Sequence, residues 1–175
     1  FAAGILGIVG ITLALAFGTS SGALVNTMIV DLDTTTAGIQ ATRTVSSGAL
    51  VDIAIVSANI TAPYKGYQWE LQWEDSKLDY ISNAENSAGH GGTLCAPAAI
   101  VNDGPPGTEW VGQGAGCFRT SGTTSFAGNL VTVQIQCVAD GATEVKLVTF
   151  VEDGLYGSSF LADGGGEMPT AYTNA

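Results

Sequence analysis

The sequence predicts an α+β protein, in which one long apolar helix at the N-terminus precedes an antiparallel β-sandwich. No charged residue occurs before Asp31, and residues 1–17 are apolar apart from glycines and Thr12. After residue 38 apolar and polar residues alternate instead, which is the period of a half-buried strand. We therefore predict a helix over 1–32, a linker over 33–38 and a sandwich domain over 39–175.

The N-terminal segment is long enough to cross a membrane. A helix needs about 20 apolar residues to span the hydrocarbon core, and residues 1–30 supply them. Small side chains at helical spacing let helices approach closely, and such a stripe is formed by Ala3, Gly7, Gly10, Ala14 and Gly18. We expect this helix to pack against other helices, with an ordinary membrane anchor as the alternative. A helix break is expected between Gly18 and Gly22.

Alternating runs predict the strands of the sandwich. In YQWELQWED, the apolar residues Tyr67, Trp69, Leu71 and Trp73 alternate with polar ones, which indicates one buried and one solvated face. The same period occurs in VDIAIV, in LVTVQIQC and over 145–151, with turn signals between the runs. Several short strands separated by turns indicate an antiparallel sandwich. The stretch 83–116 lacks regular signals, and we expect it to be an irregular loop.

The charge balance and the absent motifs exclude several functions. The chain has 5 Lys and Arg against 16 Asp and Glu, a formal net charge of −11. Binding to nucleic acid or to anionic lipid head groups needs a basic surface, so neither partner is expected. The sequence contains no phosphate-binding loop and no dinucleotide fingerprint. We expect no enzyme, and a secreted enzyme ranks third among the functions considered.

Single titratable residues give no catalytic or metal site. His90, the only histidine, lies among glycines, and we expect a solvated loop residue rather than a general base or metal ligand. Paired carboxylates can serve a glycosidase, and the candidate pairs are Glu70 with Glu74 and Asp31 with Asp33. We expect Glu70 to be solvated on the polar face of its strand, while Asp31 and Asp33 lie at the linker. A weak calcium site from scattered carboxylates is the less favoured alternative to exposed turn aspartates at Asp103, Asp153 and Asp163. We predict no cofactor and no metal.

Three cysteines allow at most one disulfide bond within the chain. Cys137 ends a strand on its inward face, and we expect a buried thiol there. Cys95 and Cys117 bracket part of the irregular stretch, and their bond would close a loop of about twenty residues. We favour this pair, while pairings with Cys137 stay open.

Two further residues suggest contact with sugars. Asn59 begins a glycosylation sequon, Asn-Ile-Thr. Trp110 lies in a glycine-rich stretch, where it either binds a sugar or covers the core.

The N-terminal organisation resembles that of a type IV pilin, because the chain starts with Phe, keeps an apolar segment and continues into a β-rich domain. The resemblance implies that a prepilin peptidase cuts before Phe1, which is then N-methylated. It implies a subunit embedded in the cell membrane that the pilus assembly machinery packs into an extracellular helical homopolymer. Ile5 departs from the Glu that most bacterial pilins carry at that position.

Residues 38–170 resemble a cohesin domain. In that family a Gly precedes a core strand of the form aromatic-x-aromatic-x-Leu-x-Tyr-Asp-Pro-x-x-Leu. Glu74 and Asp75 replace the Asp-Pro, and the matching positions are Gly66, Tyr67, Trp69, Leu71, Trp73 and Leu78. The resemblance implies a jelly-roll sandwich, and some cohesins bind dockerins. We expect the major subunit of a pilus-like filament; the alternative is a membrane-anchored, cohesin-like surface module that binds a protein or a carbohydrate.

Overall fold

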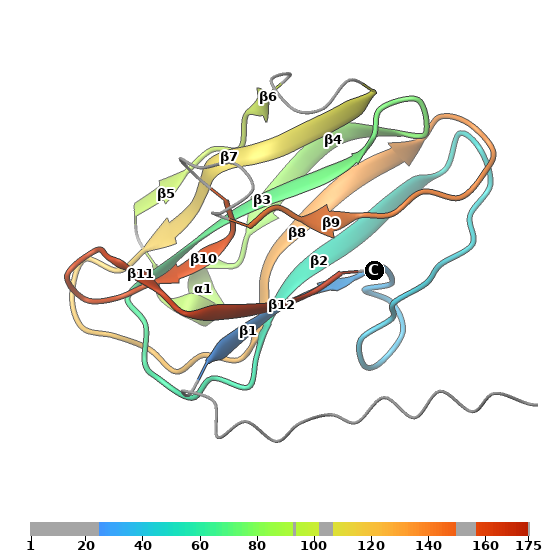
Figure 1. Cartoon of the computed structure of the whole chain (residues 1–175). Helices are drawn as coiled ribbons and strands as arrows, with labels where there is room; N and C mark the ends of the chain where they lie inside the picture. Colours follow the sequence, from blue (N-terminus) through green and yellow to red (C-terminus); the bar gives the residue numbers. More distant parts are fainter. Residues whose placement is uncertain (1–24, 93, 102–106, 150–156, 175) are drawn as a thin grey trace, which may run out of the picture.

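Two β-sheets pack face to face in the computed structural model, which describes residues 25–92, 94–101, 107–149 and 157–174 (Figure 1). The first sheet contains, in spatial order, β12 (Thr170–Thr173), β1 (Asn26–Asp31), β2 (Leu50–Ala58), β8 (Gly128–Cys137) and β4 (Leu78–Glu85). The second contains β11 (Glu167–Met168), β10 (Ser159–Leu161), β3 (Gly66–Glu74), β7 (Thr108–Phe118) and β5 (Leu94–Ala96). In addition, β6 (Ile100–Val101) pairs with β7 and β9 (Lys146–Leu147) with β3. The described helix is one short turn, α1 (Ser87–His90).

The core lies between the sheets and follows the alternation of the sequence. The inward residues of β3 are at most 1% exposed, and they are Tyr67, Trp69, Leu71 and Trp73. The predicted inward residues of β8, from Val131 to Cys137, are buried as well. Period-two patterns predict these strands well because the core face of each carries the apolar set, and a shift by one residue would turn that set away from the core.

The predicted fold class, α+β with a long N-terminal helix, is wrong for the described residues, which are almost entirely β. The helix expected over 1–32 overlaps β1, which pairs antiparallel with β2 and parallel with β12. Its buried residues include Asn26, Met28 and Val30, at period two rather than at helical spacing. The β-branched residues between them favour strand. The processed Phe1, the small-residue stripe Ala3, Gly7, Gly10, Ala14 and Gly18, and the break at Gly18 and Gly22 lie outside the described residues.

The segment predicted as a linker, residues 33–38, joins two paired strands of one sheet. The Asp33 carboxylate accepts hydrogen bonds from the hydroxyls of Thr35 and Thr36, at 2.6 and 2.8 Å. The Asp31 carboxylate accepts the backbone N–H groups of Asp33 and Gln40. The two aspartates therefore hold a turn in the connection between β1 and β2.

Candidate partner-binding edge

The outer edge of the second sheet carries a continuous apolar surface, the strip Leu94–Ile100. Within the strip, β5 and β6 pair one after the other with β7 (Figure 1). Leu94 and Ile100 are 61% and 51% exposed, and every residue of the strip except Ala98 is exposed. No Asp, Glu, Lys or Arg occurs between Glu85 and Asp103. An uncharged exposed patch is unusual on so acidic a chain and is typical of an interaction surface.

Pro97 sets the shape of the strip. Proline has no backbone N–H and ends a hydrogen-bonded ladder, and β5 indeed ends at Ala96. The edge rejoins β7 where the Gly112 N–H donates to the carbonyl oxygen of Ala99 at 2.8 Å. β5 is the last strand of its sheet in the described part of the chain, so its outer backbone edge has no strand partner there. An unpaired edge of this kind can accept a strand from another chain.

A disulfide bond fixes the strip to the sheet. Cys95 and Cys117 are bonded and lie directly opposite each other in the β5–β7 register. The favoured pairing is confirmed, and the open alternatives are excluded because Cys137 is a free, buried cysteine. Cys117 is 1% exposed whereas Cys95 is exposed, so the bond ties the surface strip to the core.

His90 lies in the core rather than in solvent. It is 0% exposed, stacked on Tyr64 with ring centroids 5.3 Å apart and edge-on to Tyr67 at 5.0 Å. Neither ring nitrogen has a hydrogen-bond partner among the described residues. Burial, aided by the charge of Arg119, lowers the pKa of His90 to about 4. The expectation of a solvated loop histidine is wrong, and the residue packs in the core instead.

The glycines beside His90 explain its burial. Gly91 has φ +75, a left-handed conformation that glycine adopts without strain. A Cβ on Gly92 would lie 2.6 Å from Nδ1 of His90 and 2.9 Å from Cβ of Cys117. The turn therefore brings the imidazole close to Cys117, and a side chain at Gly92 would collide with both residues.

The structure scatters the other polar residues that the sequence singled out. Glu70 is 0% exposed, so its predicted solvation is wrong, while Glu74 is exposed. Asp163 is exposed and pairs with Lys65 at 2.6 Å; Asp103 and Asp153 lie outside the described residues. Within the described ranges no group of three or more His, Cys, Asp or Glu is placed to hold a metal ion.

The two residues considered for sugar contact differ in exposure. Trp110 lies on β7 with 8% of its surface exposed, so it covers the sheet. Asn59 is exposed and has φ 47 in the turn that follows β2. Asn59 stays a predicted glycosylation site.

The polar network between the sheets is structural. Glu85 accepts hydrogen bonds from the Tyr67 hydroxyl at 2.6 Å and from Trp69 Nε1 at 2.7 Å. Burial raises the pKa of the Glu85 carboxyl, although these two bonds lower it. This carboxylate is therefore occupied by donors from the core strand β3.

Solved structures of cohesin modules share this fold. The solution structure of CaCohA2 from Clostridium acetobutylicum matches with a TM-score of 0.59 at 11% identity, over 86% of this chain and 88% of that one. The sixth cohesin of scaffoldin B from Acetivibrio cellulolyticus, solved in complex with a Cel5 dockerin, gives 0.53 and 13%, over 86% and 95%. A non-cellulosomal cohesin from the archaeon Archaeoglobus fulgidus gives 0.52 and 12%, over 86% and 87%. No protein-family model and no curated protein matches the chain.

These findings correct the predictions that rested on the pilin resemblance. The similar structures are cohesins, and some are complexes with dockerins. The predicted partners, other copies in a homopolymer, the pilus assembly machinery and a prepilin peptidase, are therefore wrong. The predicted localisation, in a pilus and before assembly in the membrane, is corrected on the same ground, because the similar structures are cohesin modules and not pilins. Among the described residues no helix is long and apolar enough to span a bilayer. The cohesin-like sandwich is confirmed: the described residues of this chain have the fold of a cohesin module.

Proposed function

We propose that the domain is a cohesin-like binding module that takes a dockerin-type protein partner at the strip Leu94–Ile100, and that it is not an enzyme. The observation that carries the proposal is the exposed, uncharged strip held to the core by the Cys95–Cys117 bond. Rigid apolar side chains at the centre of a contact lose little entropy on binding, which favours protein association. Cohesins of the same fold have been solved with dockerins bound.

A protein partner is favoured over a carbohydrate. Sugar rings stack on exposed aromatic rings, yet Trp69, Trp73 and Trp110 are all buried. No aromatic residue in the described ranges is exposed. The strip instead offers aliphatic side chains and a free backbone edge, and both suit a polypeptide.

The environments of the titratable residues support binding without catalysis. His90 is buried, and within the described part of the chain neither of its ring nitrogens has a hydrogen-bond partner. Glu85 is occupied by Tyr67 and Trp69. A general base needs an accessible lone pair aimed at a substrate, and neither side chain offers one.

The test is calorimetric titration with a panel of dockerin modules, including the kinds crystallised with the similar cohesins. We expect at least one to bind, and Leu94→Asp to weaken that binding by at least about tenfold, which is about 1.4 kcal/mol. Leu50→Asp is the matched control, because Leu50 on β2 is 58% exposed on the other sheet. Ile100→Asp with Ile81→Asp as its control repeats the comparison.

Two outcomes would count against the proposal. If none of the dockerins binds, the partner is not of the dockerin type. If Leu50→Asp abolishes binding while Leu94→Asp leaves it intact, the site is the first sheet and not the strip.

A further inference from the structure

We propose that Asn59 carries an N-linked glycan, a covalent modification at a site separate from the strip. Asn59, Ile60 and Thr61 form a sequon of the Asn-x-Thr kind, and no other asparagine of the chain begins one. The sequon directly follows β2, and Figure 1 shows this turn beside the start of β1. A three-residue motif also occurs by chance, and the geometry of the turn is what distinguishes Asn59.

The turn presents both functional groups of the sequon to solvent. Asn59 and Thr61 are exposed, whereas Ile60 between them is partly buried and packs against the core. Asn59 has φ 47, a left-handed conformation that asparagine adopts more readily than most residues. A glycosyl transferase must reach the amide of the first residue and the hydroxyl of the third at the same time. An inward middle residue between two exposed ones meets that requirement.

The turn is held in place without the groups that the transfer needs. The Asn26 side chain accepts the backbone N–H groups of Thr61 and Ala62, at 2.9 and 3.0 Å, and donates to the carbonyl oxygen of Ala62. The Thr61 hydroxyl lies 3.4 Å from the same Asn26 oxygen, which is a weak hydrogen bond. Within the described part of the chain, the Asn59 side chain takes part in no hydrogen bond. Both groups are therefore available on the folded domain.

The disulfide bond indicates a compartment in which N-glycans are added. Disulfides form and persist in oxidising environments outside the cytoplasm, and Cys95 and Cys117 are bonded. A sequon in a secreted protein is an acceptor when it lies in a surface loop. Asn59 satisfies both conditions.

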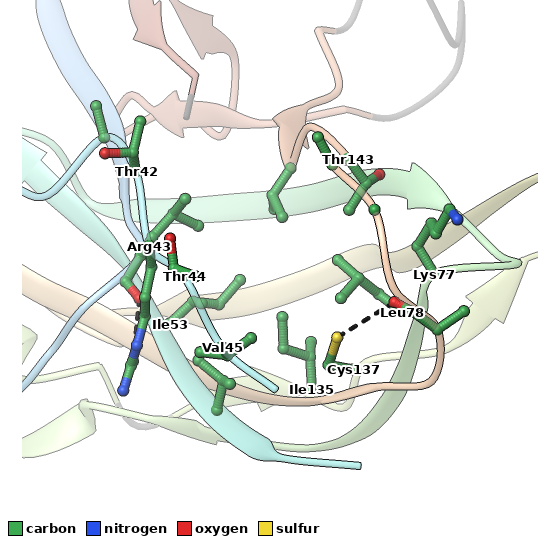
Figure 2. Close-up of a pocket in the computed structure, with 17 residues that line it drawn as sticks. Thr42, Arg43, Thr44, Val45, Ile53, Lys77, Leu78, Ile135, Cys137 and Thr143 are labelled. Carbon is green, nitrogen blue, oxygen red and sulfur yellow. Dashed lines mark hydrogen bonds between the residues drawn. The ribbon is translucent and has the colours of Figure 1, made fainter. Parts of the chain in front are cut away.

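A sugar held without a covalent bond has less support. A pocket of about 440 Å³ lies between the β1–β2 connection and the segment that follows β8. Figure 2 shows Val45, Ile53 and Ile135 around its interior, and the described residues that line it include no Trp, Tyr or Phe on which a sugar ring could stack. Trp110 is buried in the sheet. Covalent attachment at Asn59 is therefore the sugar contact that the structure supports best.

The transfer is a substitution at the first carbon of the sugar. Nδ2 of Asn59 forms a bond to C1 of an oligosaccharide that a lipid phosphate carries, while the bond from C1 to the phosphate oxygen breaks. The lipid phosphate leaves with the bonding electron pair, and one amide proton passes to a base of the transferase. No oxidant or reductant is consumed.

The first experiment is mass spectrometry of the full chain isolated from the cells that make it. Trypsin cuts after Arg43 and Lys65, so peptide 44–65 contains Asn59 as its only asparagine. We expect this peptide to carry a glycan, and electron-transfer fragmentation to place the glycan on Asn59. The peptide also contains serine and threonine residues, so the fragmentation separates an N-linked from an O-linked sugar.

The second experiment transfers a glycan to the folded chain with a purified oligosaccharyltransferase and a lipid-linked oligosaccharide. We expect transfer to the wild type, detected as an increase in intact mass by one glycan. Asn59→Gln and Thr61→Ala should each abolish the transfer, whereas Thr61→Ser, which keeps a hydroxyl, should retain it.

A control variant separates the geometry of the turn from the motif. Ala88→Thr, a change at an exposed residue, creates a second sequon at Asn86. There Nδ2 donates to the carbonyl oxygen of Asn129 at 2.8 Å and Oδ1 accepts the Gly89 N–H at 3.0 Å, so the amide is engaged with the backbone. We expect the folded variant to accept one glycan, at Asn59, and the reduced and unfolded variant to accept two.

Three results would overturn the inference. An unmodified peptide 44–65 from the cells that make the protein removes the site. A glycan placed on a serine or threonine of that peptide shows an O-linkage instead. Equal transfer to Asn59 and Asn86 in the folded Ala88→Thr chain shows that the turn does not select Asn59.

Discussion

Removal of the Cys95–Cys117 bond is the sharpest test of how the strip is held. The two cysteines are separated by 22 residues in sequence. In the chain-entropy model, opening a loop of that length lowers the free energy of unfolding by about 3.4 kcal/mol. For a chain of this size, a loss of that order lowers the melting temperature by about 10 °C.

The double variant Cys95→Ala with Cys117→Ala should show this loss in urea unfolding followed by tryptophan fluorescence. The three tryptophans are at most 8% exposed, so they report the opening of the core. The control is a reductant, which should destabilise the wild type by a similar amount and leave the double variant unchanged. A difference below about 1 kcal/mol, within the lower range of measured disulfides, would refute the argument that the bond anchors the strip.

Three further changes test the packing around the site. Gly116→Ala should lower the free energy of unfolding in urea by about 2 kcal/mol or more, because the new Cβ would collide with the carbonyl oxygen of Tyr67 and the backbone there has φ +144. Gly164→Ala is the control, because the space around Gly164 is open. Asn26→Ala should lower the free energy of unfolding by about 3 kcal/mol in the same measurement. The Asn26 side chain accepts hydrogen bonds from two backbone N–H groups of a neighbouring turn, and both would lose their partner. An unchanged free energy of unfolding would contradict this. His90 should make the protein less stable as the pH falls from about 6.5 to about 4, by about 3 kcal/mol, because the unfolded chain takes up the proton first. His90→Phe should remove that dependence, and a pH profile identical in wild type and variant would show that another group is responsible.

The alternating strands were predictable because the pattern is local. Every second residue of β3 from Tyr67 to Trp73 is buried, as its sequence indicates. The prediction failed where apolar content was considered without its period: residues 26–30 belong to the uncharged run before Asp31, yet they alternate and form most of β1. Strand β7 was missed because the glycines in TEWVGQGAGCF suggested a loop. Gly116 instead provides room for the close approach of β3.

Only part of the candidate site could be predicted from the sequence. The Cys95–Cys117 pair was favoured from its spacing, and a long stretch without charge was visible around Cys95. The exposure of Leu94 and Ile100 could not be predicted from the sequence, because it depends on their position at the edge of a sheet. In the same way, nothing near Glu70 in sequence indicates its burial; its backbone N–H donates to Ser158 Oγ at 3.0 Å, a residue from the far end of the chain.

The sequence by itself determined the strand period, the acidic balance and the number of cysteines available for bonding. The tertiary structure decided which apolar residues stay exposed, where His90 lies, and that Asn59 is exposed while the neighbouring Ile60 packs against the core. The physical reason is the range of the interactions. Periodicity reports which side of its own strand a residue occupies, whereas burial, pKa and cavities arise from contacts between segments that lie far apart in the chain.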